Sequence, residues 1–222
     1  MGRKMGDAGA CMIKVFFLIF EPSVAWQKIA QARRGYLFIT AIHLLPLILA
    51  GTALEAWGLK EHGKLQHFQF YRTFPLQEII NFEIIEFFVL FAVVWVSALL
   101  IFRIGQTFQD RLGFLQAYTV AAYGFSPLLL FHFLDASADM HPLVPWLLGI
   151  GLAVWILYQG IPRVMQPDPT HAFGVYLSGV IVVILTSGLA RLVTGMYLLG
   201  YMDLQNSWLS RKITNVFHLF GH

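Results

Sequence analysis

The chain has 222 residues, of which 58% are hydrophobic and only 12% are charged, and its formal net charge is +3. Soluble domains contain roughly 25% charged residues, so the shortage of polar surface excludes an ordinary soluble fold. The single cysteine, Cys11, excludes an intrachain disulfide and a cysteine-based zinc site, and the lack of basic runs with interleaved aromatic residues excludes nucleic-acid binding.

The first predicted element is a short helix over about residues 20–34. Pro22 suits its first turn, where the missing N–H costs nothing. Val24, Trp26 and Ile29 can face lipid while the polar residues between them face water, which is typical of an interfacial amphipathic helix. A helix packed on the protein's own cytosolic face is an equally good interpretation. We expect residues 1–34 to form a cytosolic tail that ends in this helix.

Five later segments reach the length of about 20 residues that a transmembrane helix needs. Their apolar residues stand in long blocks rather than in alternation, which favours helices over a β-barrel. The predicted fold class is therefore all-α, a polytopic membrane protein with five spans in a domain over 35–200 and a C-terminal tail over 201–222. The spans are expected at about 36–54, 84–102, 115–134, 143–161 and 173–200.

The basic residues predict the orientation of these spans. With five crossings, nine Lys or Arg residues fall on the side of the N-terminus and five on the other side. The positive-inside rule then predicts a cytosolic N-terminus and an extracytoplasmic C-terminus. The connection over residues 55–83 is the long loop of this arrangement, and we expect it on the outer side.

Proline interrupts the third predicted span within Tyr123-Gly-Phe-Ser-Pro127, and the fourth span ends on the similar Tyr158-Gln-Gly-Ile-Pro162. Pro127 removes one helical hydrogen bond and predicts a kink. Gly124 and Ser126 allow a neighbouring helix to approach closely, and the serine hydroxyl can satisfy a freed carbonyl; we assign Tyr158, Gly160 and Pro162 to the same packing role. A broken helix at a transport site is the alternative to a static kink, and we favour the kink.

Ionisable residues inside the spans are costly in lipid and usually have partners. Glu86 lies at the outer start of the second span, and His132 and Asp135 lie at the outer end of the third. Arg191 follows Phe173 by about 27 Å of helix, so it reaches the same level. We therefore predict that Glu86, His132, Asp135 and Arg191 form an outer polar cluster containing a Glu86–Arg191 ion pair.

This cluster is open to two interpretations. As a functional group it is an entry site for protons or cations, and with Asp139 and His141 the pair His132 and Asp135 could hold a metal ion. As a structural group it is an ion pair with interfacial side chains, which we favour. His43 lies near the middle of the membrane, where we expect a hydrogen bond to a backbone or hydroxyl group.

The segments that carry the family resemblance are Tyr123-Gly-Phe-Ser-Pro127, residues 148–162 ending in Tyr158-Gln-Gly-Ile-Pro162, residues 168–176, and the Pro22…Trp26…Ile29 helix. With them the chain resembles the Yip family of membrane proteins, named as Ypt-interacting proteins. The resemblance implies five spans and a cytosolic N-terminus. Eukaryotic members imply trafficking roles with Rab-type GTPases. This sequence lacks their long polar N-terminal region and their acidic Asp-Leu-Tyr-Gly-Pro stretch, which argues against a Rab partner and favours a bacterial inner-membrane protein.

These observations predict a non-enzymatic integral membrane protein that acts as a scaffold or adaptor, with the lipid bilayer and either a second copy or another membrane protein as partners. The alternative is a small ion, proton or solute transporter or channel that uses the outer polar cluster. An enzyme ranks third because no hydrolase elbow, zinc-protease, phosphate-loop or dinucleotide motif is present. No cofactor and no resident metal are expected.

Overall fold

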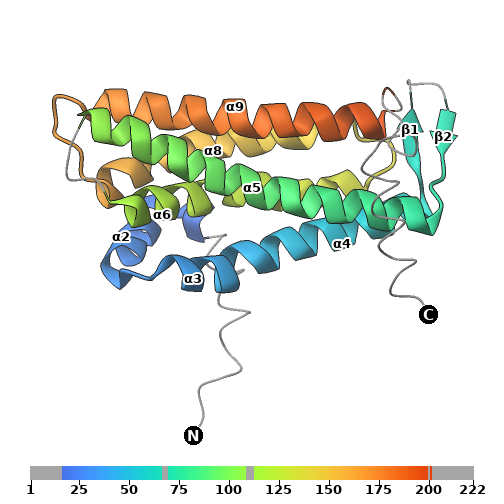
Figure 1. Cartoon of the computed structure of the whole chain (residues 1–222), viewed down its shortest axis with the longest axis horizontal. Helices are drawn as coiled ribbons and strands as arrows, with labels where there is room; N and C mark the ends of the chain where they lie inside the picture. Colours follow the sequence, from blue (N-terminus) through green and yellow to red (C-terminus); the bar gives the residue numbers. More distant parts are fainter. Residues whose placement is uncertain (1–16, 67–69, 109–112, 200, 202–222) are drawn as a thin grey trace, which may run out of the picture.

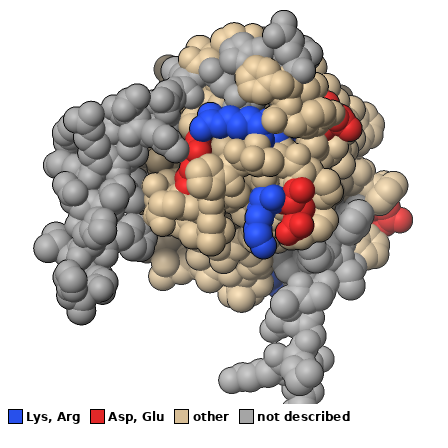
Figure 2. Space-filling model, turned by 90° about the vertical axis from the view of Figure 1, so that its right-hand side faces the viewer, with Lys and Arg blue, Asp and Glu red and all other residues tan. Residues whose placement is uncertain are grey.

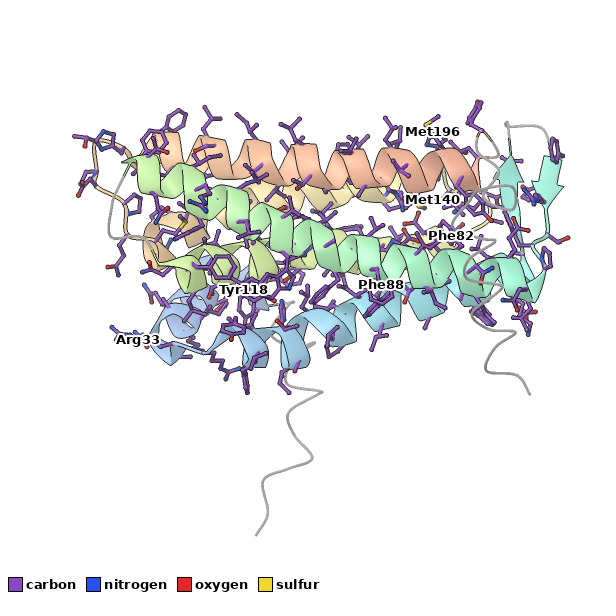
Figure 3. All side chains as sticks on the ribbon, viewed as in Figure 1. Arg33, Phe82, Phe88, Tyr118, Met140 and Met196 are labelled. Atoms are coloured by element: carbon purple, nitrogen blue, oxygen red, sulfur yellow. The ribbon has the colours of Figure 1, made fainter. Side chains whose placement is uncertain are left out.

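A computed structural model of the chain describes residues 17–66, 70–108, 113–199 and 201. The long helices run side by side along one axis, with helix α2 at one end of the bundle and a small β-hairpin at the other (Figure 1). Figure 3 places Arg33 at the α2 end and Phe82 and Met140 at the opposite end. Residues 1–16 of the expected N-terminal tail and residues 202–222 of the expected C-terminal tail lie outside the described residues.

The expectation of five apolar helices long enough to cross a membrane is confirmed. The first span, Tyr36–Glu61, consists of α3 (Tyr36–Ile39), a π-helical turn η1 (Thr40–Leu44) and α4 (Leu45–Glu61). The third span, Phe114–Ala136, joins α6 (Phe114–Gly124), α7 (Ser126–Phe131) and the 3₁₀ turn η2 (His132–Ala136). The second, fourth and fifth spans are α5 (Leu76–Phe108), α8 (Leu143–Val164) and α9 (Ala172–Leu198).

The expected long loop over 55–83 is wrong in its extent. Helix α4 continues to Glu61 and α5 already begins at Leu76, so both ends of the predicted loop are helical. Between the helices lie strands β1 (Lys64–Gln66) and β2 (Phe70–Arg72), which pair antiparallel with Leu65 opposite Tyr71. The added turns carry glutamates, which lower their hydropathy, but the side chains of Glu55 and Glu78 are buried in the protein and the helices continue through them.

The third span forms the centre of the bundle. In its most apolar stretch of 18 residues 72% is buried, against 28–39% in the matching stretches of the other four spans, because the surrounding helices cover it on several sides. The chain turns at Phe125, between α6 and α7, as the proline two residues later predicts. A Cβ atom at Gly124 would lie 2.6 Å from Leu157 of α8, so the glycine is what permits this close contact.

Helix α2 (Pro22–Ala32) packs against α8. Of the two interpretations of this helix, packing on the protein's own surface is the correct one for Trp26: its side chain is fully buried, and its indole N–H donates to the carbonyl of Ile156 at 3.0 Å. Gly160 makes room for it, since an added Cβ there would lie 2.4 Å from the indole ring. Val24 does remain exposed, so α2 presents one face to the bundle and another outward.

Candidate functional site

The structure brings Glu86, His132, Asp135 and Arg191 together at the end of the bundle that carries η2 and the hairpin, which we call the charged end. Glu86 comes from α5, His132 and Asp135 from η2, and Arg191 from α9. All four are buried, with 7% or less of each residue exposed. Viewed from this end, Figure 2 shows a mostly tan face with only a few basic and acidic side chains, so most of this charge lies beneath the surface.

Asp135 is the centre of the ionic contacts. One of its oxygens forms an ion pair with Arg191 Nη2, and the other lies 3.0 Å from His132 Nδ1. Arg191 also donates through Nε to the carbonyl of Pro142 at 2.8 Å. The expected ion pair between Glu86 and Arg191 is present at 3.8 Å between Oε1 and Nη1, so Glu86 is the more distant of the two acidic partners.

A central member of the group, Glu55 of α4, was not predicted from the sequence. This side chain is fully buried, and its Oε2 lies 3.1 Å from His132 Nε2. It was assigned to the outer loop because hydropathy alone ends the first span at Leu54. The signal that would have found it is the helical spacing of Gly51, Glu55 and Gly58, which places two small residues on the same face as the acid.

Those two glycines bring α4 against η2. A Cβ at Gly51 would lie 2.7 Å from the His132 ring, and one at Gly58 would lie 2.2 Å from the carbonyl oxygen of Ala136. The close approach delivers Glu55 to His132 and leaves no room for a larger side chain at either position.

Two further ionisable residues border this group. Lys64 of β1 donates to the carbonyls of Asp135 at 2.8 Å and Ser137 at 2.9 Å, and burial lowers the pKa of its amine. Glu83, one turn before Glu86 on α5, has two buried carboxylate oxygens that accept no hydrogen bond from the described residues. We use the name charged cluster for seven residues: Glu55, Lys64, Glu83, Glu86, His132, Asp135 and Arg191.

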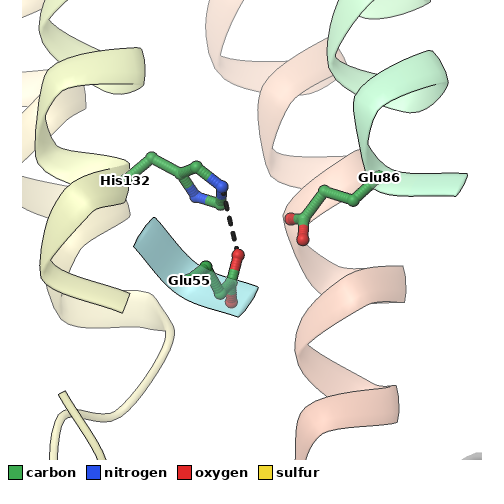
Figure 4. A group of neighbouring side chains, drawn as sticks. All are labelled: Glu55, Glu86 and His132. Atoms are coloured by element: carbon green, nitrogen blue, oxygen red, sulfur yellow. Dashed lines mark ion pairs between the residues drawn. The ribbon is translucent and has the colours of Figure 1, made fainter. Parts of the chain in front are cut away.

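The side chains that the structure places close enough to bind a metal ion differ from those expected from the sequence. Asp139 accepts a hydrogen bond from Tyr71, which raises the pKa of that phenol, and His141 Nδ1 accepts from the backbone N–H of Leu143. Among the described residues, the side chains that meet the spacing for a metal ion are Glu55, Glu86 and His132, with one ligand atom of each within 4.8 Å of the others. Figure 4 shows these three side chains pointing toward one another from three different elements.

The residues around the kink form a second buried polar group, in the middle of the bundle. His43 Nε2 lies 2.8 Å from the hydroxyl of Ser126, and the His43 and Tyr123 rings lie 4.2 Å apart between centroids. Ser126 thus partners a histidine, where the sequence suggested a freed carbonyl. Tyr158 and Pro162 lie on the outward side of α8, and Tyr158 packs edge-on against Tyr176.

Two of the cavities among the described residues lie on either side of the kink in the third span, one toward each end of the bundle. One, of about 50 Å³, adjoins the charged cluster and is lined by Glu86, His132, Asp135 and Arg191 together with apolar residues of α5, α7, α8 and α9. The other, of about 410 Å³, lies beside α2 and is lined by three arginines, Arg33, Arg34 and Arg163, with residues of α6 and α8. The two cavities share no lining residue.

A comparison with models of protein families matches residues 16–192 of the chain to the Yip1 domain. Searches of the curated proteins and of the solved structures find no match.

Proposed function

The chain belongs to the Yip1 domain family of multi-pass, non-enzymatic membrane proteins, and from this premise we propose that it is a scaffold or adaptor. In this role it gathers a second copy or another membrane protein through lateral contacts between helices. The Rab-type GTPases of the eukaryotic relatives are not part of this proposal.

The observation that carries the proposal is the filled middle of the bundle. A transporter needs a continuous polar path between the two sides, whereas the two cavities here are separate. Tyr123 lines the cavity toward the α2 end and Phe125 lines the cavity toward the charged end. Around the kink, Phe125, Leu129 and Leu157 are each no more than 3% exposed, and they lie beside the buried polar pair His43 and Ser126.

A surface suited to lateral contact lies on α8. Leu148, Gly151, Trp155 and Tyr158 share one face at helical spacing, and the three larger residues are about half exposed. A Cβ added at Gly151 would have no atom within 4 Å. A glycine between large apolar side chains forms a shallow notch that another helix can enter, which is how small residues promote helix association in bilayers.

The proposal is tested by purifying the full chain from its native membrane in mild detergent at endogenous expression. We expect a dimer or a stable complex with another membrane protein, and Gly151→Leu should reduce it at least tenfold because the notch is filled. Leu189→Phe, a bulky change on the exposed face of α9, is the matched control and should leave the complex intact. A strictly monomeric particle with no co-purifying protein would overturn the scaffold.

The runner-up function is cation or proton movement, and the buried charged cluster is what favours it. It requires a path from His132 past Leu129 to Ser126 and His43, where the present packing is apolar. Flux measured in proteoliposomes separates the two functions. The scaffold predicts no proton or cation flux above that of empty vesicles, and a flux that disappears in Ser126→Ala would favour transport.

For orientation we propose a cytosolic N-terminus, supported by the three arginines around the cavity at the α2 end. In a Cys11→Ser background, Arg33→Cys and Lys60→Cys place one thiol at each end of the bundle. A membrane-impermeant maleimide added to intact cells should label the second thiol and spare the first. The reverse pattern would invert the topology. Residence in a bacterial inner membrane stays a prediction.

A further inference from the structure

The part of the molecule with the most unexplained chemistry is the space between Glu55, Glu86 and His132. Three elements, α4, α5 and η2, each deliver one side chain to it, and the three residues are 0%, 2% and 6% exposed. Figure 4 shows the carboxylates and the imidazole edge facing this common space. We propose that Glu55, Glu86 and His132 bind a divalent transition-metal ion that joins these three elements.

Buried carboxylate oxygens without hydrogen bonds support the binding of a cation at this site. Glu86 Oε2 is buried and accepts no hydrogen bond from the described residues, and the same holds for both oxygens of the adjacent Glu83. Ionised carboxylates only accept, so Glu55 and Glu86 cannot satisfy each other. Facing carboxylates in a buried site need either a cation between them or a shared proton.

The charge balance of the cluster indicates the size of the missing charge. When every group is ionised, the four carboxylates of Glu55, Glu83, Glu86 and Asp135 face two cations, Arg191 and Lys64. Two negative charges remain when His132 is neutral. A divalent cation with a neutral imidazole ligand brings the cluster to zero, and buried charge is stable only when it is compensated in this way.

The contacts of His132 have the form expected of a metal ligand. Its Nδ1 lies 3.0 Å from Asp135 Oδ2, so a proton on Nδ1 directs the lone pair of Nε2 toward Glu55. Metal-ligating histidines commonly donate their second ring N–H to a carboxylate that fixes the tautomer. Here Arg191 in turn neutralises Asp135, which leaves Asp135 as a support and not as a ligand.

The dimensions of the site suit a small ion after a modest adjustment. The three ligand atoms lie within 4.8 Å of one another, and ligands about 2.1 Å from an ion are about 3 to 4 Å apart. Rotation of the two flexible glutamates closes that difference. The adjoining cavity of about 50 Å³ has room for a water molecule as a further ligand. One imidazole and two carboxylates select Zn²⁺, Mn²⁺ or Fe²⁺ over Ca²⁺, which prefers six or more oxygens.

The test uses the full chain in mild detergent, stripped with a chelator and then supplied with Zn²⁺, Mn²⁺ or Ca²⁺. We expect about one equivalent of Zn²⁺ per chain by elemental analysis, a rise of several degrees in the unfolding midpoint with excess Zn²⁺, and no rise with Ca²⁺. Glu86→Gln should weaken Zn²⁺ binding at least tenfold. Glu61→Gln, at the exposed end of the same helix as Glu55, is the matched control and should bind as the unmodified chain does.

A second readout needs no variant that could fail to fold. Co²⁺ bound to the unmodified chain should give visible absorption bands of a low-coordinate nitrogen and oxygen site, and Zn²⁺ should displace them. The proposal is overturned if the chain binds no stoichiometric ion and its unfolding midpoint is unchanged by Zn²⁺, in which case Glu55 and Glu86 share a proton. Binding that is equal in Glu86→Gln and Glu61→Gln would also overturn it.

Discussion

The two ends of the bundle handle charge in opposite ways. At the charged end Arg191 is buried, and its guanidinium contacts Asp135, Glu86 and a backbone carbonyl. At the α2 end Arg33 is exposed and borders an open cavity, where water can solvate it. A charge at the α2 end can therefore be removed alone, whereas each charge at the charged end depends on the others.

The largest expected difference between the two ends is in the unfolding free energy lost when an arginine is neutralised. Arg191→Met leaves buried carboxylates without their cation and should lower the unfolding free energy by about 3–5 kcal/mol. Arg163→Met removes a half-buried arginine whose side-chain contacts are with Gln159 of its own helix, and should cost less than about 1 kcal/mol. SDS-induced unfolding from mild-detergent micelles measures both. Equal losses would mean that burial does not distinguish the two ends.

The α2 end should instead depend on one aromatic residue. Trp26→Ala removes a fully buried indole and its hydrogen bond to Ile156, so we expect a loss of about 3 kcal/mol and release of α2 from α8. Trp57→Ala is the control, because 55% of that residue is exposed. Protease sensitivity near residue 34 reports the release. An unchanged cleavage rate in Trp26→Ala would show that other contacts hold α2.

Two glycine substitutions distinguish a tightly packed position from an open one within the transmembrane helices. Gly58→Ala drives a methyl group into the backbone of Ala136 and should cost about 1–3 kcal/mol by separating α4 from η2. Gly151→Ala meets no atom and should be neutral or slightly stabilising, because alanine is the better helix former. Thermal unfolding of the two variants side by side checks the difference, which a neutral Gly58→Ala would contradict.

The smallest expected effect is a pH dependence at Lys64. Burial lowers the pKa of this amine below its ordinary 10.5, so the unfolded chain holds the proton more tightly than the folded chain. The contribution of Lys64 to stability therefore rises as pH rises between the lowered pKa and 10.5, by at most about 1.4 kcal/mol per pH unit. Lys64→Met should flatten that rise at pH values below 10.5, whereas Lys60→Met, an exposed change, should not. Identical slopes in both variants would contradict the assignment.

The fold was predictable because its signals are local. The lengths of the apolar segments predicted the five spans, and Pro127 predicted the turn at Phe125. The convergence of Glu86, His132, Asp135 and Arg191 followed from helix rise alone, since groups at the same depth on adjacent helices have only each other as partners.

Other features depended on contacts between segments that lie far apart in the sequence. Glu55 was assigned to a loop because hydropathy treats an acid as a sign of water, whereas here it lies opposite His132. For Trp26 the sequence left both lipid and the protein's own surface open, and the notch at Gly160, far along the chain, accepts the side chain. In both cases glycines permit the close contact, on the same helix as Glu55 and on the helix opposite Trp26, and which surfaces meet is tertiary information.

The charges at the charged end stabilise one another. A double-mutant cycle between Asp135 and Arg191 measures the coupling free energy between two of them. Asp135→Asn and Arg191→Met are made singly and together, and the unfolding free energy of each is measured in the same detergent. The account predicts that the double variant loses at least about 1 kcal/mol less than the two single losses combined, because each single change strands the other charge. Additive losses would contradict it.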